Sequence, residues 1–268
     1  MIPINILVEN STDKKDMLCG KGLSILINTK EQKILFDTGS NSAFIKNAKK
    51  LDLNLSEIDS LILSHAHDSF IGGVNQFCKI NKTAQIVMQN IDTNRYFRIE
   101  KKFKYDVGPS FGLKIFSRIR MINNPAQITT NSWFIPYTVK DYGRPKKNTL
   151  FYKMIDDEMK QDNFAHEGIF VIDDSGELVI FNSCSHNGVV NAIESAREFF
   201  PNKRVRSYVG GMHFPYSEKD EIPPDDIRNL EEIVDYANYT PTEPKEEDEE
   251  ADRIEENELI DEDKAYSK

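Results

Sequence analysis

Five histidines are the residues of this chain best suited to bind a metal ion. Two of them, His65 and His67, are separated by one alanine and directly follow the short apolar run of residues 61–63. Residues two apart in an extended segment point to the same side, so both imidazoles can reach one ion at about 2.0–2.1 Å if that ion is zinc. A histidine pair of this kind more often only satisfies local hydrogen bonds, so a metal site requires a third nitrogen from elsewhere in the chain.

His186 is the candidate for this third nitrogen, because it lies in a turn after a second apolar run at residues 177–182. The ends of strands in such sheets gather at one edge, where ligands usually bind. Three nitrogens and a water molecule can lower the pKa of that water toward 7 and produce a nucleophile. The sequence therefore predicts a site for one divalent ion, with zinc as the first candidate and iron and manganese as alternatives.

Alternating strands and helices are predicted to position these histidines. Apolar patterns predict strands at residues 2–8, 22–29, 32–36, 61–63, 84–88, 168–173, 177–182 and 205–209. They predict helices at residues 41–50, about 73–79, 188–199 and 226–237. This order predicts a mixed α/β domain, in which the middle segment between the strand at 84–88 and the hairpin at 168–182 is not assigned.

Charge divides the chain into two parts. Residues 240–268 contain thirteen acidic and four basic residues and carry −9 of the net charge of −10, so the preceding 239 residues carry only −1. A nearly neutral body argues against a broad nucleic-acid surface. The sequence therefore predicts one domain at residues 1–239, large enough for a substantial core, and an acidic tail at 240–268 with too few apolar residues to fold.

Targeting signals and cysteine pairs are not found in the sequence. No stretch approaches the roughly 20 apolar residues of a membrane span, and the first residues lack the basic start and long apolar centre of a signal peptide. The cysteines Cys19, Cys78 and Cys184 lack the spacing of a zinc site or a disulfide framework. We therefore expect a cytoplasmic protein with free thiols and no membrane partner.

A basic segment at residues 95–120 carries eight basic and two acidic residues, a local charge of +6. It either attracts an anionic substrate or is only a solvated basic face, and the second interpretation is slightly preferred. A further hypothesis is that the acidic tail folds back on this segment and covers the site, or that the tail binds a protein partner. If deletion of the tail left ligand affinity and its salt dependence unchanged, the first of these would be wrong.

Four segments in order resemble successive motifs of a known family. They are ILFDTG at 34–39, LSHAHDSFIGG at 63–73, NSCSHNGVVN at 182–191 and VGGMHF at 209–214. Together they resemble the metallo-β-lactamase superfamily, and the last two are similar to its branch that includes the dihydropterin aminobenzene-phosphate synthases. The resemblance covers about residues 2–236. It implies an αββα sandwich with metal ions at the sheet edge, whose C-terminal part is truncated and replaced by the acidic tail.

The metal-ligand pattern of that superfamily, H-x-H-x-D-H, is broken in this chain. Ser69 stands in place of the aspartate and Phe70 in place of the following histidine, and a further C-terminal histidine has no counterpart. The resemblance still matches His65, His67 and His186 to the three ligands of the first metal site. It therefore implies a single-metal site beside a degenerate second one.

The resemblance also assigns roles to five other residues. Asp68 stands one residue before the lost aspartate and is the candidate for catalytic proton transfer. Asp37 resembles a carboxylate that hydrogen-bonds a ligand histidine, although an Asx-type turn explains it equally well. His166, Glu167 and His213 resemble positions near the substrate pocket, where they would bind a polar or anionic group.

Two classes of function follow from these residues. The first is a metal-dependent hydrolase or transferase acting on a small anionic substrate, a phosphate or carboxylate ester. The second is a catalytically impaired relative that binds a small molecule or a protein, because Ser69 and Phe70 replace two ligands. A third interpretation, that the C-terminal sequence is a foreign extension, predicts poor solubility and low thermal stability.

Overall fold

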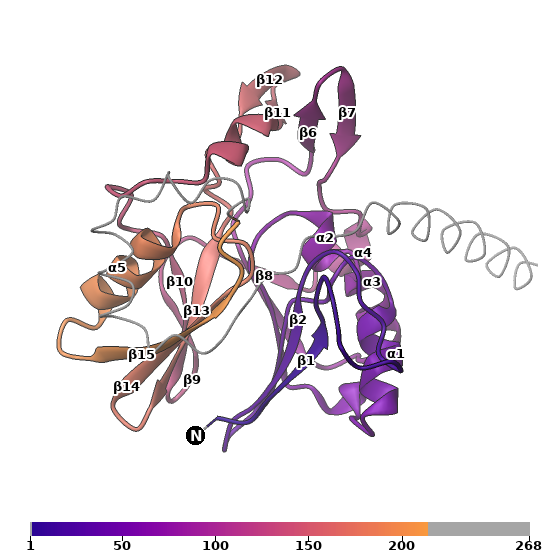
Figure 1. The fold of residues 1–268 in the computed structure, drawn as a ribbon, viewed down its shortest axis with the longest axis vertical. Helices are drawn as coiled ribbons and strands as arrows, with labels where there is room; N and C mark the ends of the chain where they lie inside the picture. Colours follow the sequence, from indigo (N-terminus) through magenta and orange to yellow (C-terminus); the bar gives the residue numbers. More distant parts are fainter. Residues whose placement is uncertain (1, 214–268) are drawn as a thin grey trace, which may run out of the picture. The chain divides into compact units, whose positions relative to one another are not determined.

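The computed structural model describes residues 2–213 (Figure 1). The helix expected at residues 226–237, the acidic tail at 240–268 and the domain boundary between them lie outside the described residues. The assigned elements agree closely with the expected ones on either side of the middle segment, and the α/β fold class is confirmed.

Two large sheets form the centre of the fold. The first contains, in spatial order, β1 (Ile4–Val8), β2 (Ser24–Asn28), β3 (Lys33–Phe36), β4 (Ser60–Leu63), β5 (Gln85–Gln89) and β8 (Ile119–Ile122). The second contains β15 (Arg204–Gly210), β14 (Glu177–Asn182), β13 (Gly168–Asp174), β10 (Ser132–Pro136) and β9 (Ala126–Thr129). The first sheet is parallel from β3 to β8, and the second is antiparallel except for the β14–β15 pair.

Helices cover the outer faces of both sheets (Figure 1). The first sheet packs against α1 (Ala43–Lys50) and α3 (Val74–Ile80), which contribute Phe44 and Phe77 to a shared cluster. The second packs against α5 (Val189–Phe199) through Ala192 and Ile193. The remaining helical turns are η1 (Leu55–Glu57), α2 (Asp68–Ile71), α4 (Leu113–Phe116) and η2 (Lys146–Leu150). The layers therefore follow the order helix, sheet, sheet, helix.

The layering follows from alternation of side chains along each strand. Successive residues of a strand point to opposite faces of its sheet. In β4, Leu61 and Leu63 join the helix-side cluster, while Ile62 joins the cluster between the sheets. In β14, Phe181 faces the other sheet while Ile180 faces α5. Strands buried on both faces read as continuous apolar runs, which is why the sequence predicts them well.

A third, smaller sheet was not expected from the sequence. It contains β12 (Glu158–Gln161), β11 (Phe151–Ile155), β6 (Tyr96–Glu100) and β7 (Phe103–Asp106) in that order, and it projects at the top of Figure 1. All four residues of β7 and of β12 are exposed. A strand without a buried face has no apolar alternation, so the pattern that reveals the other strands is missing here.

The ends of several strands meet at one edge of the molecule, next to this small sheet. β3 ends before Asp37, β4 before Ser64, and β14 before Ser183. A backbone hydrogen bond of 3.0 Å from Gly168 to Ser64 joins the first residue of β13 to the end of β4. The loops after these strands, which carry the predicted metal ligands, therefore lie close together.

One close backbone approach fixes the loop after β4. Gly22 has a φ of +97°, and a Cβ atom at this position would lie 1.7 Å from the backbone oxygen of Ser69. Only glycine allows both this conformation and this contact. Among residues 2–213, no helix is long and apolar enough to cross a bilayer.

Candidate metal centre

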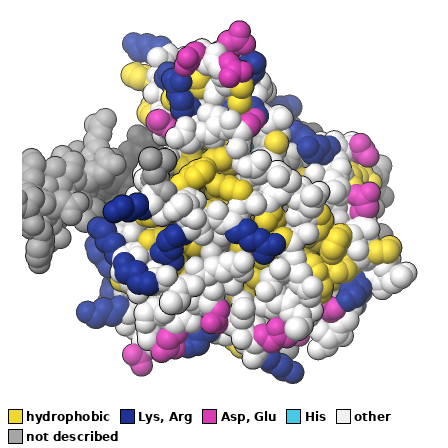
Figure 2. Space-filling model, turned by 180° about the vertical axis from the view of Figure 1, so that it is seen from behind, with side chains coloured by type: hydrophobic (Ala, Val, Ile, Leu, Met, Phe, Trp, Pro, Cys, Tyr) yellow, Lys and Arg dark blue, Asp and Glu magenta, His cyan; other side chains and the backbone are white. Residues whose placement is uncertain are grey.

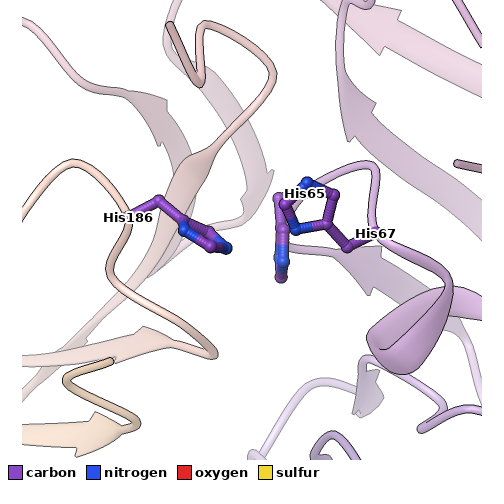
Figure 3. Close-up of side chains that lie close together, drawn as sticks. All are labelled: His65, His67 and His186. Atoms are coloured by element: carbon purple, nitrogen blue, oxygen red, sulfur yellow. The ribbon is translucent and has the colours of Figure 1, made fainter. Parts of the chain in front are cut away.

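The three predicted ligand histidines meet at the edge where strands of both large sheets end. His65 and His67 come from the loop after β4, and His186 reaches them from the loop after β14 (Figure 3). One nitrogen from each ring forms a group whose members all lie within 4.8 Å of one another. All three side chains are buried, and none of the three residues is more than 3% exposed. The expected juxtaposition of these residues is present in the structure.

His65 is oriented by a chain of hydrogen bonds that begins at Asp37. The Asp37 carboxylate accepts a hydrogen bond from the Ser64 backbone N–H (2.8 Å) and another from the Ser64 hydroxyl (2.6 Å). It also accepts one from the hydroxyl of Ser183. Because the Ser64 hydroxyl donates its proton to Asp37, its oxygen accepts from His65 Nδ1 at 2.7 Å. The proton of His65 therefore lies on Nδ1, and Nε2 keeps the lone pair that a metal needs.

Asp37 contacts Ser64, which contacts His65, so among the described residues the carboxylate is linked to the ligand histidine through Ser64 and not by a direct hydrogen bond. Its backbone has a φ of +55°, as in the turn that the sequence indicates. Burial raises the pKa of this carboxyl to about 7, although the hydrogen bonds from Ser183 and Ser64 oppose the rise. The role of Asp37 in metal binding stays a prediction.

His186 is oriented by two other residues. Its Nδ1 lies 3.0 Å from Oδ1 of Asn148, while the amide group of Asn148 donates to the His186 carbonyl (2.6 Å). Since the amide oxygen can only accept, His186 carries its proton on Nδ1 as well. The Glu167 carboxylate holds the loop by accepting from the backbone N–H groups of His186 (2.9 Å) and Asn187 (2.7 Å) and from the Asn187 side chain (2.9 Å).

The Nε2 atoms of His65, His67 and His186 are buried and have no hydrogen-bond partner among the described residues. Burial lowers the pKa of His65 and of His186 well below the ordinary value, and it lowers that of His67 to about 4, so all three rings are neutral at pH 7. A buried polar atom without a partner is unfavourable by about 1–3 kcal/mol. Three neutral imidazoles that converge with free lone pairs are the donor set of a zinc site, so these residues fit a divalent ion.

A fourth histidine, His166, lies beside the cluster but its ring is fully engaged. Its Nδ1 accepts from the backbone N–H of Ala66 (3.1 Å), and its Nε2 therefore donates to Asp162 (3.0 Å). Burial alone would raise the pKa of Asp162, but the hydrogen bond from His166 and the neighbouring His67 hold it well below its usual range. His166 and Glu167 thus secure the ligand loops, and the substrate contact that the resemblance implies for them stays a prediction.

His213 lies beside His186. Its ring centroid is 4.4 Å from that of His186, and its Nδ1 lies 3.2 Å from the sulfur of Cys184. Burial, then His67 and the cations Lys147 and Arg98, lower the pKa of His213 to about 4. The three cysteines are free thiols, as expected, and Cys184 with His186 and His213 forms a further group of close donors. Lys147 and Arg98 show that positive charge lies near the His213 ring.

Asp68 is not brought into any of the close donor groups of the described chain. It is the first residue of α2 and half-buried, and its carboxyl lies near Asp106 and Lys21 rather than near the histidines. Burial raises the pKa of this carboxyl, and the neighbouring Asp106 adds to the rise. Asp68 and Ser69 are successive residues of α2, so their side chains point in directions about 100° apart. Catalysis by Asp68 stays a prediction without support from this arrangement.

The two substitutions in the ligand pattern have different consequences. The ring of Phe70 packs on that of His65, with 4.7 Å between centroids. An apolar ring therefore occupies space next to His65, at the position where the pattern that this chain resembles has a histidine. Ser69 contributes its backbone to the contact with Gly22. No carboxylate reaches the cluster from either position.

The basic segment lies partly in the small sheet. Several of its cations are paired or stacked: Arg95 contacts Asp157 (2.9 Å), Arg98 contacts Glu100 (2.5 Å), and the Lys104 ammonium lies over Phe97. Figure 2 shows several Lys and Arg side chains on the face of the molecule opposite to that of Figure 1, and no histidine side chain is visible there. The choice between an anion-attracting segment and a solvated basic face stays a prediction. Arg98 is the cation of this segment that lowers the pKa of His213.

Three contributors to the site were not identified from the sequence. Ser64 and Asn148 orient ligand rings, and Asp162 places a carboxylate beside His67. Ser64 adjoins a ligand, so its position was a usable signal. Asn148 and Asp162 lie in the unassigned middle segment, where one sequence offers no local sign of their contacts.

Comparisons with known proteins agree with this geometry. The family model described as the metallo-β-lactamase superfamily matches residues 18–134. An uncharacterised protein of Methanocaldococcus jannaschii is 24% identical over 217 residues, covering 78% of each chain. The 7,8-dihydropterin-6-methyl-4-(β-D-ribofuranosyl)-aminobenzene-5′-phosphate synthase of the same organism is 28% identical over 222 residues, covering 75% of this chain and 73% of that one. A crystal structure of a metal-dependent hydrolase of the β-lactamase superfamily superposes with a TM-score of 0.73 at 23% identity, covering 87% and 86%.

Proposed function

Because this chain is a metallo-β-lactamase-fold protein, we propose that it is a metal-dependent hydrolase or transferase with one metal ion, acting on a small phosphate or carboxylate ester. The observation that carries the proposal is the convergence of three buried, unpartnered Nε2 atoms from His65, His67 and His186. A divalent ion bound there supplies Lewis-acid activation of a water molecule and of the ester. The proposed cofactor is zinc, with the chain in the cytosol.

The residues of the chain prepare this chemistry in two ways. The Asp37–Ser64 pair and Asn148 fix the tautomers of two ligand histidines before any ion binds, so no reorganisation is needed on binding. Burial excludes water from the ligands, which strengthens every electrostatic interaction at the site. The site is therefore preorganised on the ends of rigid strands.

An anionic substrate is favoured by the positive charge near His213. Lys147 belongs to η2, which also carries Asn148, and both Lys147 and Arg98 act on His213. Cations beside a metal centre attract phosphate and carboxylate groups and help to orient them. The ring of His213 can donate or accept a hydrogen bond near these two cations. We therefore propose that Lys147, Arg98 and His213 hold the anionic group of the substrate.

Hydrolysis of a panel of esters tests the proposal. We expect the zinc- or manganese-loaded protein to cleave phosphate or carboxylate esters, and a Lys147→Ala variant to have a raised KM with little change in kcat. Lys46→Ala, a lysine on α1, is the matched control. Equal turnover by a His186→Ala variant, or a preference for neutral esters, would overturn the proposal.

A second function is favoured by the packing of Phe70 on His65, which fills the neighbourhood of the ligand with an apolar ring. In this alternative the chain is an impaired relative that binds a small molecule or a protein. The double variant Ser69→Asp/Phe70→His separates the two functions. An inert parent together with an active variant would favour the binding role, whereas an active parent excludes it.

A further inference from the structure

The thiol of Cys184 lies beside the ring of His213, and the ends of two neighbouring strands bring them together. β14 and β15 run parallel, and Asn182 is paired with Gly210 at their ends. A Cβ atom at Gly210, where φ is +144°, would lie 1.6 Å from the backbone oxygen of Asn182, so only glycine allows this approach. The segments that follow the two strands place Sγ of Cys184 3.2 Å from Nδ1 of His213.

The direction of this hydrogen bond decides which nitrogen of His213 carries the proton. A neutral imidazole has one N–H group and one lone pair, so either the thiol donates to Nδ1 or Nδ1 donates to the sulfur. The Cys184 side chain is buried, and a buried thiol keeps its proton at neutral pH. Sulfur is only a weak acceptor, whereas a ring nitrogen with a lone pair is a good one. The thiol therefore donates to Nδ1, and the proton of His213 lies on Nε2.

We infer that Cys184 makes His213 a hydrogen-bond donor at Nε2 for the anionic group of the substrate. The inference rests on the proposed function. Nε2 of His213 is buried and has no hydrogen-bond partner among residues 2–213, so its N–H group is available to a ligand. Cys184 is thus a positioning residue, which acts on the substrate only through His213.

The surroundings of the His213 ring fit an anion. The cations Lys147 and Arg98 lie near it, and Nε of Arg98 is also buried without a hydrogen-bond partner in the described part of the chain. Arg98 is paired with Phe151 across the small sheet, and the Phe151 ring lies 6.0 Å from that of His213. Phosphate or carboxylate oxygens can accept from N–H groups of this kind, whereas a lone pair on Nε2 would repel them.

Two other roles of Cys184 explain less. A buried cysteine often only fills space as a small apolar side chain, but that role requires no contact between Sγ and Nδ1. Cys184, His186 and His213 also form a close donor group. Nδ1 of His186 lies against Asn148, and its Nε2 is the nitrogen proposed to bind the ion. His186 therefore has no lone pair left for a second ion.

Two spectra of the metal-free full chain test the direction of the hydrogen bond. Nitrogen NMR of the five labelled histidines should show the proton of His213 on Nε2. The variant His213→Gly, in which glycine tolerates the φ of +54°, identifies the signals of this ring. In the infrared, the S–H stretch that Cys184→Ser removes should lie at higher frequency in His213→Gly, because donation weakens the S–H bond. A His213 proton on Nδ1 in the wild type, or an unmoved S–H band, would overturn the inference.

Calorimetric titration of the zinc-supplemented full chain with inorganic phosphate tests the consequence for binding. We expect Cys184→Ala to raise the Kd for phosphate by about 3- to 10-fold, the size of coupling found within one hydrogen-bond network. Cys184→Ser should stay within about twofold of the wild type, because its hydroxyl can still donate to the ring. The matched control is Cys78→Ala, since Cys78 and Cys184 are each 7% exposed, and it should bind phosphate like the wild type.

The variant His213→Gly shows whether Cys184 acts through the ring. In this background Cys184→Ala should have no further effect on the Kd for phosphate. An unchanged Kd in Cys184→Ala alone, or an equal loss in the His213→Gly background, would overturn the inference. A wild type that bound no phosphate but carried the His213 proton on Nε2 would instead contradict the anionic substrate of the proposed function, so the two failures are distinguishable.

Discussion

Replacing Asp37 by asparagine should reverse the hydrogen-bond chain that orients His65. In the native chain the Ser64 hydroxyl donates to the carboxylate, so its oxygen must accept from His65 Nδ1. An asparagine amide in the same place donates to Ser64 instead, and the hydroxyl then donates to His65 Nδ1. The proton of His65 moves to Nε2, which is the atom that faces the metal. Asparagine tolerates the φ of +55° at this position, so the backbone should not change.

The expected loss of metal affinity in Asp37→Asn follows from what hydrogen bonds that orient a metal ligand usually contribute. Loss of a group that orients a metal ligand typically reduces metal affinity by about 10- to 100-fold, or about 1.4–2.7 kcal/mol of binding free energy. The assay is zinc titration by calorimetry at about pH 8, where the Asp37 carboxyl is mainly ionised. Nitrogen NMR of the histidine rings in the metal-free protein reports the tautomer directly.

Asp52→Asn is the matched control for this prediction. Asp52 has a φ of +54° and is exposed, so the same substitution occurs in the same backbone conformation away from the site. Its zinc affinity should equal that of the wild type. If Asp37→Asn bound zinc as tightly as this control, or if His65 kept its proton on Nδ1 in the variant, the hydrogen-bond chain would not govern the ligand.

Three further predictions concern stability. Because the folded-state pKa of Asp37 is raised from 3.8 to about 7, this carboxyl makes the free energy of unfolding of the metal-free protein fall as pH rises from about 4 to 7. The buried histidines, whose pKa values are lowered, make it rise over part of the same range, so the test is the difference between two proteins. In urea titrations the free energy of unfolding of Asp37→Asn should gain more with rising pH than that of the wild type, and equal slopes would contradict the assignment. Glu167→Ala should lower the free energy of unfolding by about 3–5 kcal/mol, because three buried donors lose their acceptor. It should also weaken metal binding through His186. A loss of stability below about 1 kcal/mol would refute this prediction. Gly22→Ala should destabilise the fold by at least about 2 kcal/mol in thermal unfolding. The control is Gly20→Ala, whose added Cβ meets no atom within 4 Å and which should keep a Tm near that of the wild type. Similar Tm values for the two variants would be inconsistent with the close approach of Gly22 to Ser69.

The large sheets could be predicted because burial leaves a clear pattern. The strands ending before Asp37, Ser64 and Ser183 are buried on both faces, so each reads as a short apolar run followed by polar residues. The parallel order of β3 and β4 then places two of these ends side by side. The convergence of His65, His67 and His186 was therefore predictable from the strand assignments together with the motif resemblance.

The small sheet and the carboxylate beside it were not predictable for a physical reason. Exposed strands such as β7 and β12 bury no face, so their residues follow no periodic pattern. Asp162 reaches His67 across ninety-five positions of sequence, and such a contact is set by the packing of β11 and β12 rather than by any local motif. Sequence reasoning therefore identifies the ligands on the core strands but misses the groups that loops bring to them.

Metal content per chain is the measurement that tests the central claim most directly. Protein purified without chelator should contain about one equivalent of a divalent metal by elemental mass spectrometry, because three buried Nε2 atoms otherwise remain without partners. A His65→Ala/His186→Ala double variant, prepared in parallel, should contain almost none. No metal in the wild type, an equal content in the variant, or two equivalents in the wild type would contradict a single-ion centre held by these histidines.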